Sequence, residues 1–290
     1  MEQQADISAR QQWSNTSHER RVESFYAWGA ERYFNFHDGY LNFGLWEDGM
    51  KDYVQAAENM VHRIATLVGV NKDSYVCDVA CGMGTQDIYV MRNFSPKQID
   101  AVDVTWPHIV HGRRRATQAG YNDRINFHHG TAANLPFPAE TFTNVMSIEG
   151  PVHFDTREQF MREAYRVLKP GGTFALADYT MKRPPRNIFE SFVIHSAARL
   201  WKVPQENRDT AERYCEKLKR SGFTDIELQE VGAQTIPGYY FEQRRPETIR
   251  EISKIRGFVA GRLGIIIDVA VYQAFRFGLL EYILVRAKKR

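Results

Sequence analysis

Apolar residues along the chain mark out short strands that alternate with helices. Short apolar runs that end in turns occur at residues 75–81, 99–104, 125–130, 143–150 and 172–180. Between them lie stretches with apolar residues three and four apart, which is the helical period. Strands that alternate with helices of this size predict an α/β fold with a doubly wound parallel sheet and helices on both faces.

Segments at the N-terminus and in the second half of the chain break this alternation. The polar to amphipathic pattern of residues 1–35 predicts a helix, and a loop dense in aromatic residues and glycine follows it. We divide the chain into an N-terminal helix with an aromatic cap loop, a core, a cap insertion, and a segment that completes the core and carries a second helical insertion. Their bounds are residues 1–58, 59–180, 181–208, and 209–290 with the insertion at 237–278.

Residues 257–280 form a long, mostly apolar stretch. Arg262, Asp268 and Arg276 interrupt it, so no uninterrupted run approaches the roughly 18 residues that a membrane-spanning helix needs. We therefore predict no integral membrane segment, but a helix that is buried under the cap or in a subunit contact. A peripheral membrane contact is the alternative for this stretch.

Composition and charge narrow the class of protein. Hydrophobic residues make up 43% of the 290 residues and charged residues 25%, which is typical of soluble globular enzymes. The formal net charge of +3 is too small to indicate a nucleic-acid partner. Cys77, Cys81 and Cys215 form neither a disulfide framework nor a zinc spacing, and the polar N-terminus lacks the apolar segment of a signal peptide. We therefore expect a cytoplasmic protein without a metal site.

A glycine-broken turn follows the first predicted strand in "YVCDVACGMGTQD". Gly82 and Gly84 lack Cβ atoms, so a ligand can approach the backbone there, at the start of a helix. Asp103 ends the second strand, where a carboxylate can accept hydrogen bonds from both hydroxyls of a ribose. A dinucleotide site would have a third glycine at position 87, where this chain has Asp87, which would repel a pyrophosphate. The pattern predicts a ribose-bearing ligand without a pyrophosphate.

Four motifs together resemble those of class I S-adenosylmethionine-dependent methyltransferases. "VCDVACGMGT" and "AVDV" are similar to the family's first glycine motif and its second-strand acidic motif. "TAANLPFPAETF" resembles the adenine-side loop, and "YRVLKPGGTFALADY" the helix, turn and strand ahead of the insertion. The resemblance covers about residues 60–180. It implies a Rossmann-like methyltransferase sheet with a helical N-terminal and insertion cap, and S-adenosylmethionine as cofactor.

The resemblance also implies which residues bind the cofactor. Asp78 and Gly82 would hold the methionine part, Asp78 through its ammonium group, directly or by water, and Asp103 would take the ribose hydroxyls. Thr131, where many relatives have an aspartate, and Ala132 would border the adenine. The full set of implied cofactor contacts is Asp78, Ala80, Gly82, Gly84, Asp103, Val104, Thr131, Ala132 and Ile148.

Three titratable residues near the ends of later strands are candidates for catalysis. Glu149 and His153 follow the fourth strand, on the side where the acceptor should bind. Asp178 lies at the end of the next strand, where it could orient His153. In small-molecule methyltransferases that this stretch resembles, a histidine at this place is the general base for a hydroxyl acceptor.

A second resemblance concerns the acceptor. "FYAWGAERYFNFHDGYLNFGLW" is similar to the aromatic N-terminal region of sterol side-chain and related isoprenoid C-methyltransferases. Methylation of an alkene creates a carbocation, which aromatic faces stabilise. We expect a pocket lined by aromatic residues of this region and of the cap insertion, chiefly Tyr26, Tyr33, Trp46, Phe189 and Phe192, with further candidates Trp28, Phe36, Tyr40, Phe43 and Trp201.

These observations predict a methyltransferase of secondary metabolism that acts on a bulky, hydrophobic small molecule. The leading hypothesis is C-methylation of an isoprenoid-bearing, terpenoid acceptor through a carbocation, with Glu149 or His153 removing a proton. The alternative is O- or N-methylation of a natural product with His153 as general base and Asp178 as its orienter. A catalytically silent fold is a third hypothesis, and the N-terminal helix is a candidate contact for a homo-oligomer.

Overall fold

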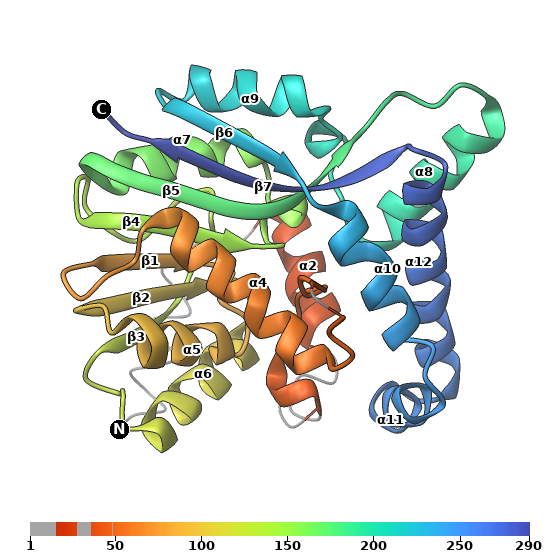
Figure 1. Cartoon of the computed structure of the whole chain (residues 1–290), viewed down its shortest axis with the longest axis horizontal. Helices are drawn as coiled ribbons and strands as arrows, with labels where there is room; N and C mark the ends of the chain where they lie inside the picture. Colours follow the sequence, from red (N-terminus) through yellow and green to blue (C-terminus); the bar gives the residue numbers. More distant parts are fainter. Residues whose placement is uncertain (1–15, 28–35, 48) are drawn as a thin grey trace.

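The computed structural model of the protein describes residues 16–27, 36–47 and 49–290. Within these residues, seven strands form one sheet in the order β3-β2-β1-β4-β5-β7-β6 (Figure 1). The strands are β1 (Tyr75–Val79), β2 (Gln98–Asp103), β3 (Ile125–His129), β4 (Phe142–Ile148), β5 (Leu168–Met181), β6 (Thr224–Glu230) and β7 (Leu280–Lys288).

The sheet is mixed, so the prediction of a purely parallel sheet is wrong at one strand. β7 runs antiparallel to both β5 and β6, whereas β1 to β5 pair in parallel. The predicted alternation of strands and helices is otherwise confirmed. α12 ends near the carboxyl end of β5, so β7 begins there. To pair with β5, β7 must therefore run in the opposite direction to it.

Helices cover both faces of the sheet, as the sequence predicts. One face carries α4 (Tyr53–Val68), α5 (Thr85–Phe94) and α6 (Trp106–Ala119), and the other carries α7 (Arg157–Val167) and α9 (Ala211–Arg220). α4 illustrates why these segments are helical. The Asp52 side chain caps its N-terminus by accepting from the Gln55 amide at 3.0 Å, and its apolar face is fully buried.

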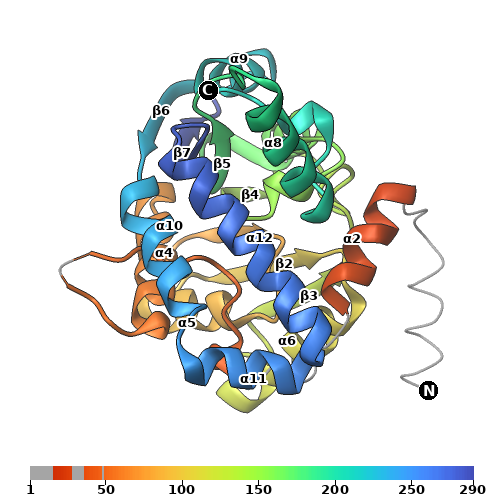
Figure 2. The ribbon, with the colours of Figure 1, turned by 90° about the vertical axis from the view of Figure 1, so that its right-hand side faces the viewer.

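The remaining helices lie beyond the carboxyl ends of the parallel strands (Figures 1 and 2). They are α2 (Ser17–Ala27), α8 (Ile188–Leu200), α10 (Gly232–Glu242), α11 (Pro246–Arg256) and α12 (Phe258–Arg276), with short 3₁₀ helices η1 (Phe36–Gly39), η2 (Pro151–His153) and η3 (Gln205–Asn207). The second helical insertion begins at Gly232, because α10 continues through Pro237.

The helix expected within residues 257–280 is present as α12. It contacts α8, α10 and α11, and so lies among the other helices of this layer. Within the described ranges, none of the helices combines the length and the apolar character needed to cross a bilayer. The rest of the predicted N-terminal helix, residues 1–15 and 28–35, lies outside the described residues.

Candidate active site

A cavity lies at the carboxyl ends of β1, β2, β3 and β4. Its floor consists of the loops that follow these strands, at residues 80–86, 103–108, 130–132 and 149–155. α2, the loop around residues 39–43, and residues of α10 and α12 form its other walls. In a doubly wound sheet, ligands bind at this edge, so the cavity is the candidate active site.

The turn after β1 exposes backbone to the cavity. Ala80 and Gly82 have left-handed φ values of 68° and 56°, and both line the cavity. Gly84 does not line it. A Cβ on Gly84 would lie 2.6 Å from the ring of Phe127 and 3.0 Å from Gly112 Cα, so this glycine lets α6 and β3 pack against the turn. The sequence predicted the turn correctly, but Gly84, expected among the cofactor contacts, packs against Phe127 and Gly112 and does not line the cavity.

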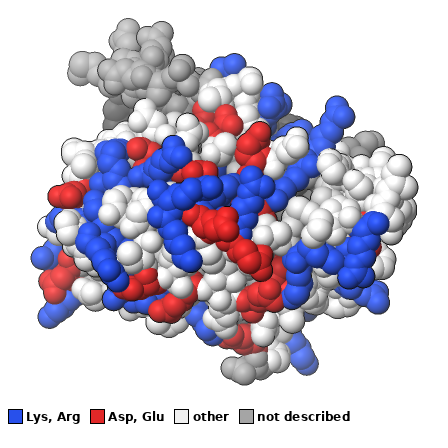
Figure 3. All heavy atoms as spheres, turned by 90° about the horizontal axis from the view of Figure 1, so that it is seen from above, with Lys and Arg blue, Asp and Glu red and all other residues white. Residues whose placement is uncertain are grey.

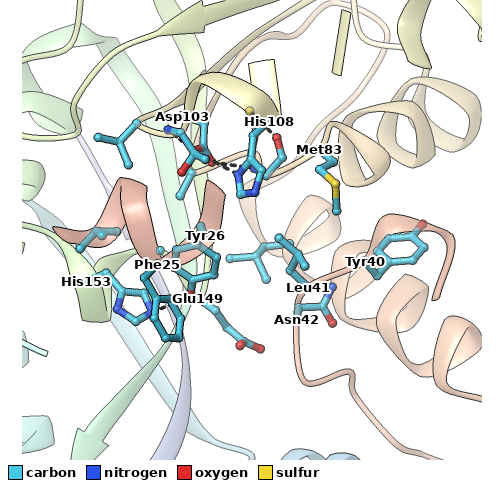
Figure 4. A pocket seen from close by; sticks show the side chains of 18 of the residues that line it. Phe25, Tyr26, Tyr40, Leu41, Asn42, Met83, Asp103, His108, Glu149 and His153 are labelled. Carbon is cyan, nitrogen blue, oxygen red and sulfur yellow. Dashed lines mark hydrogen bonds and ion pairs between the residues drawn. The ribbon is translucent and has the colours of Figure 1, made fainter. Parts of the chain in front are cut away.

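Asp103 faces the cavity as the sequence predicts. Its Oδ2 accepts from the Gly82 amide at 2.9 Å, and its Oδ1 accepts from the Thr105 amide at 2.8 Å, with His108 Nδ1 at 3.3 Å (Figure 4). Burial alone would raise the pKa of this carboxyl, but His108 and the two amides together hold it below its usual range. Asp103 therefore stays ionised, as an acceptor for sugar hydroxyls requires.

Thr131 and Ala132 follow β3 and line the same cavity, together with Val104 and Ile148. The Thr131 hydroxyl donates to the carboxylate of Glu19, a buried residue of α2 that also lines the cavity. Glu19 therefore brings an acceptor carboxylate from the N-terminal helix to the end of β3. Sequence reasoning missed it, because nothing in a polar N-terminal helix signals which residue folds inward.

Asp78 is not among the residues that line the cavity, so of the two predicted modes of contact the one through an intermediary fits its position better than a direct contact. It is fully buried, and its Oδ2 accepts from Gln86 Nε2 at 2.5 Å. Gln86, in the first turn of α5, does line the cavity. Asp78 therefore acts on the cavity through Gln86, a residue that the glycine motif could have pointed to because it opens the following helix.

Asp87 lies beside Asp78 and also fails to reach the cavity. Burial is the main cause that raises the pKa of the Asp87 carboxyl well above its usual value, and the negative charge of Asp78 adds to this effect. Burial raises the pKa of Asp78 to about 6. The reason given for excluding a dinucleotide is therefore wrong, because Asp87 points into the protein interior and does not confront a ligand.

Glu149 sits in the cavity directly after β4 and is held by three donors. Its Oε1 accepts from the Phe43 amide at 2.6 Å and from the Tyr282 hydroxyl at 2.7 Å, and its Oε2 accepts from the Tyr179 hydroxyl at 3.2 Å. Burial raises the pKa of Glu149 to about 7 despite these donors. The carboxyl is thus poised to take up or release a proton near neutral pH.

Aromatic rings gather around Glu149. Phe43 stacks on Tyr239 of α10 with ring centroids 3.9 Å apart, and it contacts Tyr179 at 5.4 Å and Trp201 at 5.9 Å. Phe43, Trp201 and Tyr239 line the cavity, as do Phe25 and Tyr26 of α2. Tyr239, in the second helical insertion, is an aromatic residue that sequence reasoning missed.

The structure bears out only part of the predicted aromatic lining. Tyr26 lines the cavity. Trp46 does not; its indole N–H donates to the Phe43 carbonyl at 2.9 Å and its ring packs against Gly238. Phe189 and Phe192 lie on the outer face of α8, 66% and 69% exposed, so their assignment to the pocket is wrong. Tyr33 and Trp28 lie outside the described residues, and the Phe36 side chain is not described.

His153 lines the cavity, and Tyr26 is its partner there. The Tyr26 hydroxyl lies 2.8 Å from His153 Nε2 (Figure 4), and His18 Nε2 bonds the His153 carbonyl at 2.8 Å. Burial, followed by the nearby His18, lowers the pKa of His153 to about 3. The imidazole is therefore neutral at neutral pH, and its conjugate acid is strongly disfavoured.

Asp178 does not orient His153, which corrects the prediction. It is fully buried, and its Oδ2 forms an ion pair with Arg157 Nε at 2.7 Å and accepts from the Tyr214 hydroxyl at 3.0 Å. Both residues lie near the carboxyl edge of the sheet, but Asp178 points to the face covered by α7 and α9. Arg157 lies on α7, and no pattern in the sequence indicates that it pairs with Asp178.

Comparison with known proteins identifies the domain. Residues 76–172 match the family model described as a methyltransferase domain. The chain is 32% identical over 196 residues to erythromycin 3''-O-methyltransferase of Saccharopolyspora erythraea, an alignment that covers 66% of this chain and 64% of that relative. Residues 76–172 are therefore a methyltransferase domain, and the resemblance to class I S-adenosylmethionine-dependent methyltransferases is confirmed.

Two further relatives extend the similarity over nearly the whole chain. Sterol 24-C-methyltransferase of Pneumocystis carinii is 24% identical over 284 residues, which cover 93% of this chain and 72% of that protein. The crystal structure of geranyl diphosphate C-methyltransferase from Streptomyces coelicolor A3(2), in complex with Mg²⁺, geranyl diphosphate and S-adenosyl-L-homocysteine, superposes with a TM-score of 0.74 at 15% identity, covering 96% of this chain and all of that one (100%). These matches confirm the predicted methyltransferase class, its cofactor and its Rossmann-like sheet.

The residues of this methyltransferase site fit S-adenosylmethionine. An ionised carboxylate, Asp103, stands where ribose hydroxyls need an acceptor, and the turn at Ala80 and Gly82 leaves backbone open to a ligand. Gln86 presents an amide beside that turn. Since Asp103 follows β2 and Thr131 follows β3, we expect the nucleoside end of the cofactor to lie towards β3 and its reacting end towards Glu149 after β4.

Proposed function

We propose that the protein methylates an alkene carbon of a bulky, largely apolar, isoprenoid-bearing small molecule. One observation carries this proposal: a buried carboxyl with a pKa near 7, Glu149, lies among aromatic rings at the acceptor end of the cavity. Such a site combines what alkene methylation needs, namely stabilisation of a cation and a base that removes a proton.

Each part of the site has a role in this reaction. Asp103 and Gln86 bind and orient the cofactor, which supplies an electrophilic methyl group when bound. The rings of Phe43, Tyr239 and Trp201 exclude water and stabilise positive charge that develops on the acceptor, by ~0.5–2 kcal/mol each when desolvated. Glu149 then accepts the proton that the methylated carbon skeleton loses.

The proton has a defined destination on Glu149. From the described residues, Oε1 accepts two hydrogen bonds, from Phe43 N and the Tyr282 hydroxyl, whereas Oε2 accepts one longer bond, from the Tyr179 hydroxyl. Oε2 is therefore the less occupied oxygen among these contacts, and it is the atom that we assign as proton acceptor. The two tyrosine hydroxyls keep the carboxylate oriented before the proton arrives.

Oxygen methylation of a natural product is the second candidate function. The erythromycin O-methyltransferase relative, at 32% identity, favours it. In this reaction His153 would be the general base. Its pKa near 3 makes the imidazole a weak base, and Asp178 is not available to strengthen it, so the geometry favours Glu149 and the carbon reaction.

A labelling experiment distinguishes the two candidates. The protein is incubated with S-adenosylmethionine carrying a ¹³C methyl group and with a panel of isoprenoid alkenes and hydroxylated or phenolic natural products. We expect label to appear on carbon of an isoprenoid compound, as read from the ¹³C chemical shift of the product methyl. Label on oxygen would refute the carbocation proposal and establish the second candidate.

A further inference from the structure

α8 presents an apolar face to solvent. The exposed fractions of Ile188, Phe189 and Phe192 are 88%, 66% and 69%, and Phe192 lies four residues after Ile188 and three after Phe189, spacings that place side chains on the same side of a helix. On the opposite side, Ile194 is buried in a small cluster with Ala274 and Leu279. One face of α8 therefore anchors the helix to the fold, and the other exposes three large apolar side chains that have no role in the cavity.

Positive charge surrounds this apolar face. Residues 182–202 contain five Lys or Arg residues and one Glu, a formal charge of +4, whereas the whole chain carries only +3. Lys182 already pairs with Glu230 at 2.6 Å, and Arg183 with Glu190 at 2.8 Å. Cations thus remain at both ends of the helix, with Arg186 before it and Arg199 and Lys202 at its end.

The surface view agrees with this distribution. Figure 3 shows the molecule from above, and its right-hand end, where Figure 1 places α8, is largely white with blue at its edge. Helices that lie in the headgroup region of an anionic bilayer have such an apolar face, bordered by cationic side chains. Each Lys or Arg near such a surface adds electrostatic attraction.

We propose that α8 docks the protein onto an anionic lipid surface, with Ile188, Phe189 and Phe192 entering the interface. A second copy of the chain suits this face poorly, because a two-fold symmetric contact through α8 would bring two equally cationic segments together. This surface is distinct from residues 257–280, for which a peripheral membrane contact was the alternative, because α12 packs among the other helices.

Docking through α8 would also bring the acceptor cavity close to lipid. Trp201 directly follows α8, lines the cavity, and contacts the rings of Phe43 and Tyr179 near Glu149. An apolar acceptor dissolved in the bilayer could then enter the cavity beside Trp201. This second step rests on the proposed function, whereas the docking itself does not.

Vesicle sedimentation tests the docking without any measurement of activity. The full chain is mixed with phosphatidylglycerol–phosphatidylcholine vesicles and, separately, with pure phosphatidylcholine vesicles. We expect binding to the anionic vesicles that weakens at high salt, and that falls about tenfold or more in the Phe189→Ser/Phe192→Ser variant. The matched control is Phe241→Ser on α10, which removes an aromatic ring that is 59% exposed and should leave vesicle binding unchanged.

Circular dichroism and a thermal melt confirm that each variant is folded before it is used. Loss of binding in the α8 variant, with the control and the folding unchanged, supports the docking. Absence of wild-type binding to anionic vesicles, or equal loss in both variants, would overturn it. Self-association of the wild type that disappears in the α8 variant, seen by analytical ultracentrifugation, would also overturn it and assign the face to a second copy.

Discussion

Glu149→Gln should lower the turnover rate by about 10²- to 10⁴-fold. Glutamine has the same shape and keeps an oxygen that accepts from the Phe43 amide and the Tyr282 hydroxyl, so the site remains folded. It cannot accept a proton from the acceptor. Single-turnover rates with a saturating acceptor measure the effect, and the affinity for S-adenosylhomocysteine should not change.

The pH dependence of the wild-type rate should identify the same carboxyl. Because the base must be ionised and its pKa is raised to about 7, the rate should fall about tenfold per pH unit below pH 7. His153, with a pKa near 3, should add no inflection between pH 5 and 8, and His153→Asn should have a much smaller effect than Glu149→Gln. The reverse order of the two variants would instead support oxygen methylation.

A suitable control for the carboxyl-to-amide change is Glu58→Gln. Glu58 also has a pKa raised by burial and accepts from a tyrosine hydroxyl, that of Tyr40, but it does not line the cavity. Its amide variant should retain the wild-type rate. A similar loss in both variants would mean that the Glu149 effect is structural and not catalytic.

Arg157→Leu should lower the free energy of unfolding by about 3–5 kcal/mol. The Arg157 side chain is 1% exposed, its guanidinium pairs with Asp178 at 2.7 Å and with Asp209 at 3.6 Å, and it donates to the Tyr179 carbonyl at 2.7 Å. Leucine would leave the Asp178 carboxylate buried without its cation. Urea denaturation measures the change.

The same helix offers a matched control in Arg162→Leu. Arg162 is 64% exposed and pairs with Glu158 one turn away at 2.9 Å, an interaction of about 0.3–0.5 kcal/mol. The two variants change the same residue type on α7 and differ in burial. If Arg157→Leu lowered the free energy of unfolding no more than Arg162→Leu does, the buried ion-pair network would not be what holds β5 in place. It would then not be what positions Tyr179 of β5 beside Glu149.

Sequence alone predicted the parts of the site that depend on local chain geometry. The turn through Ala80 and Gly82, and Asp103 at the end of β2, follow from glycine spacing and strand period, and both line the cavity as expected. Glu149 and His153 were found the same way, because a residue just after a buried strand must lie at the edge of the sheet.

What the sequence could not predict depends on contacts between distant segments. Asp178 was predicted to orient His153 because both residues lie at the same edge of the sheet, yet Asp178 forms an ion pair with Arg157 of α7. Phe189 and Phe192 were predicted to line the pocket, but both are exposed. In a helix with aromatic residues on several sides, the sequence does not show which side faces the cavity. The roles of Glu19 and Tyr239 appear only once α2 and α10 are folded over the sheet.

The most direct test of the account is a calorimetric titration of the protein with S-adenosylhomocysteine, repeated on Asp103→Asn and on Asp100→Asn. Asp103 lines the cavity, whereas Asp100, on the same strand, pairs with His128 at 2.8 Å and does not. We predict wild-type binding that weakens about tenfold or more in Asp103→Asn and is unchanged in Asp100→Asn, since one hydrogen bond to a charged group is worth about 1.5–3 kcal/mol. Failure of the wild-type protein to bind would contradict the assignment of this cavity to S-adenosylmethionine, and with it the proposed methyl transfer.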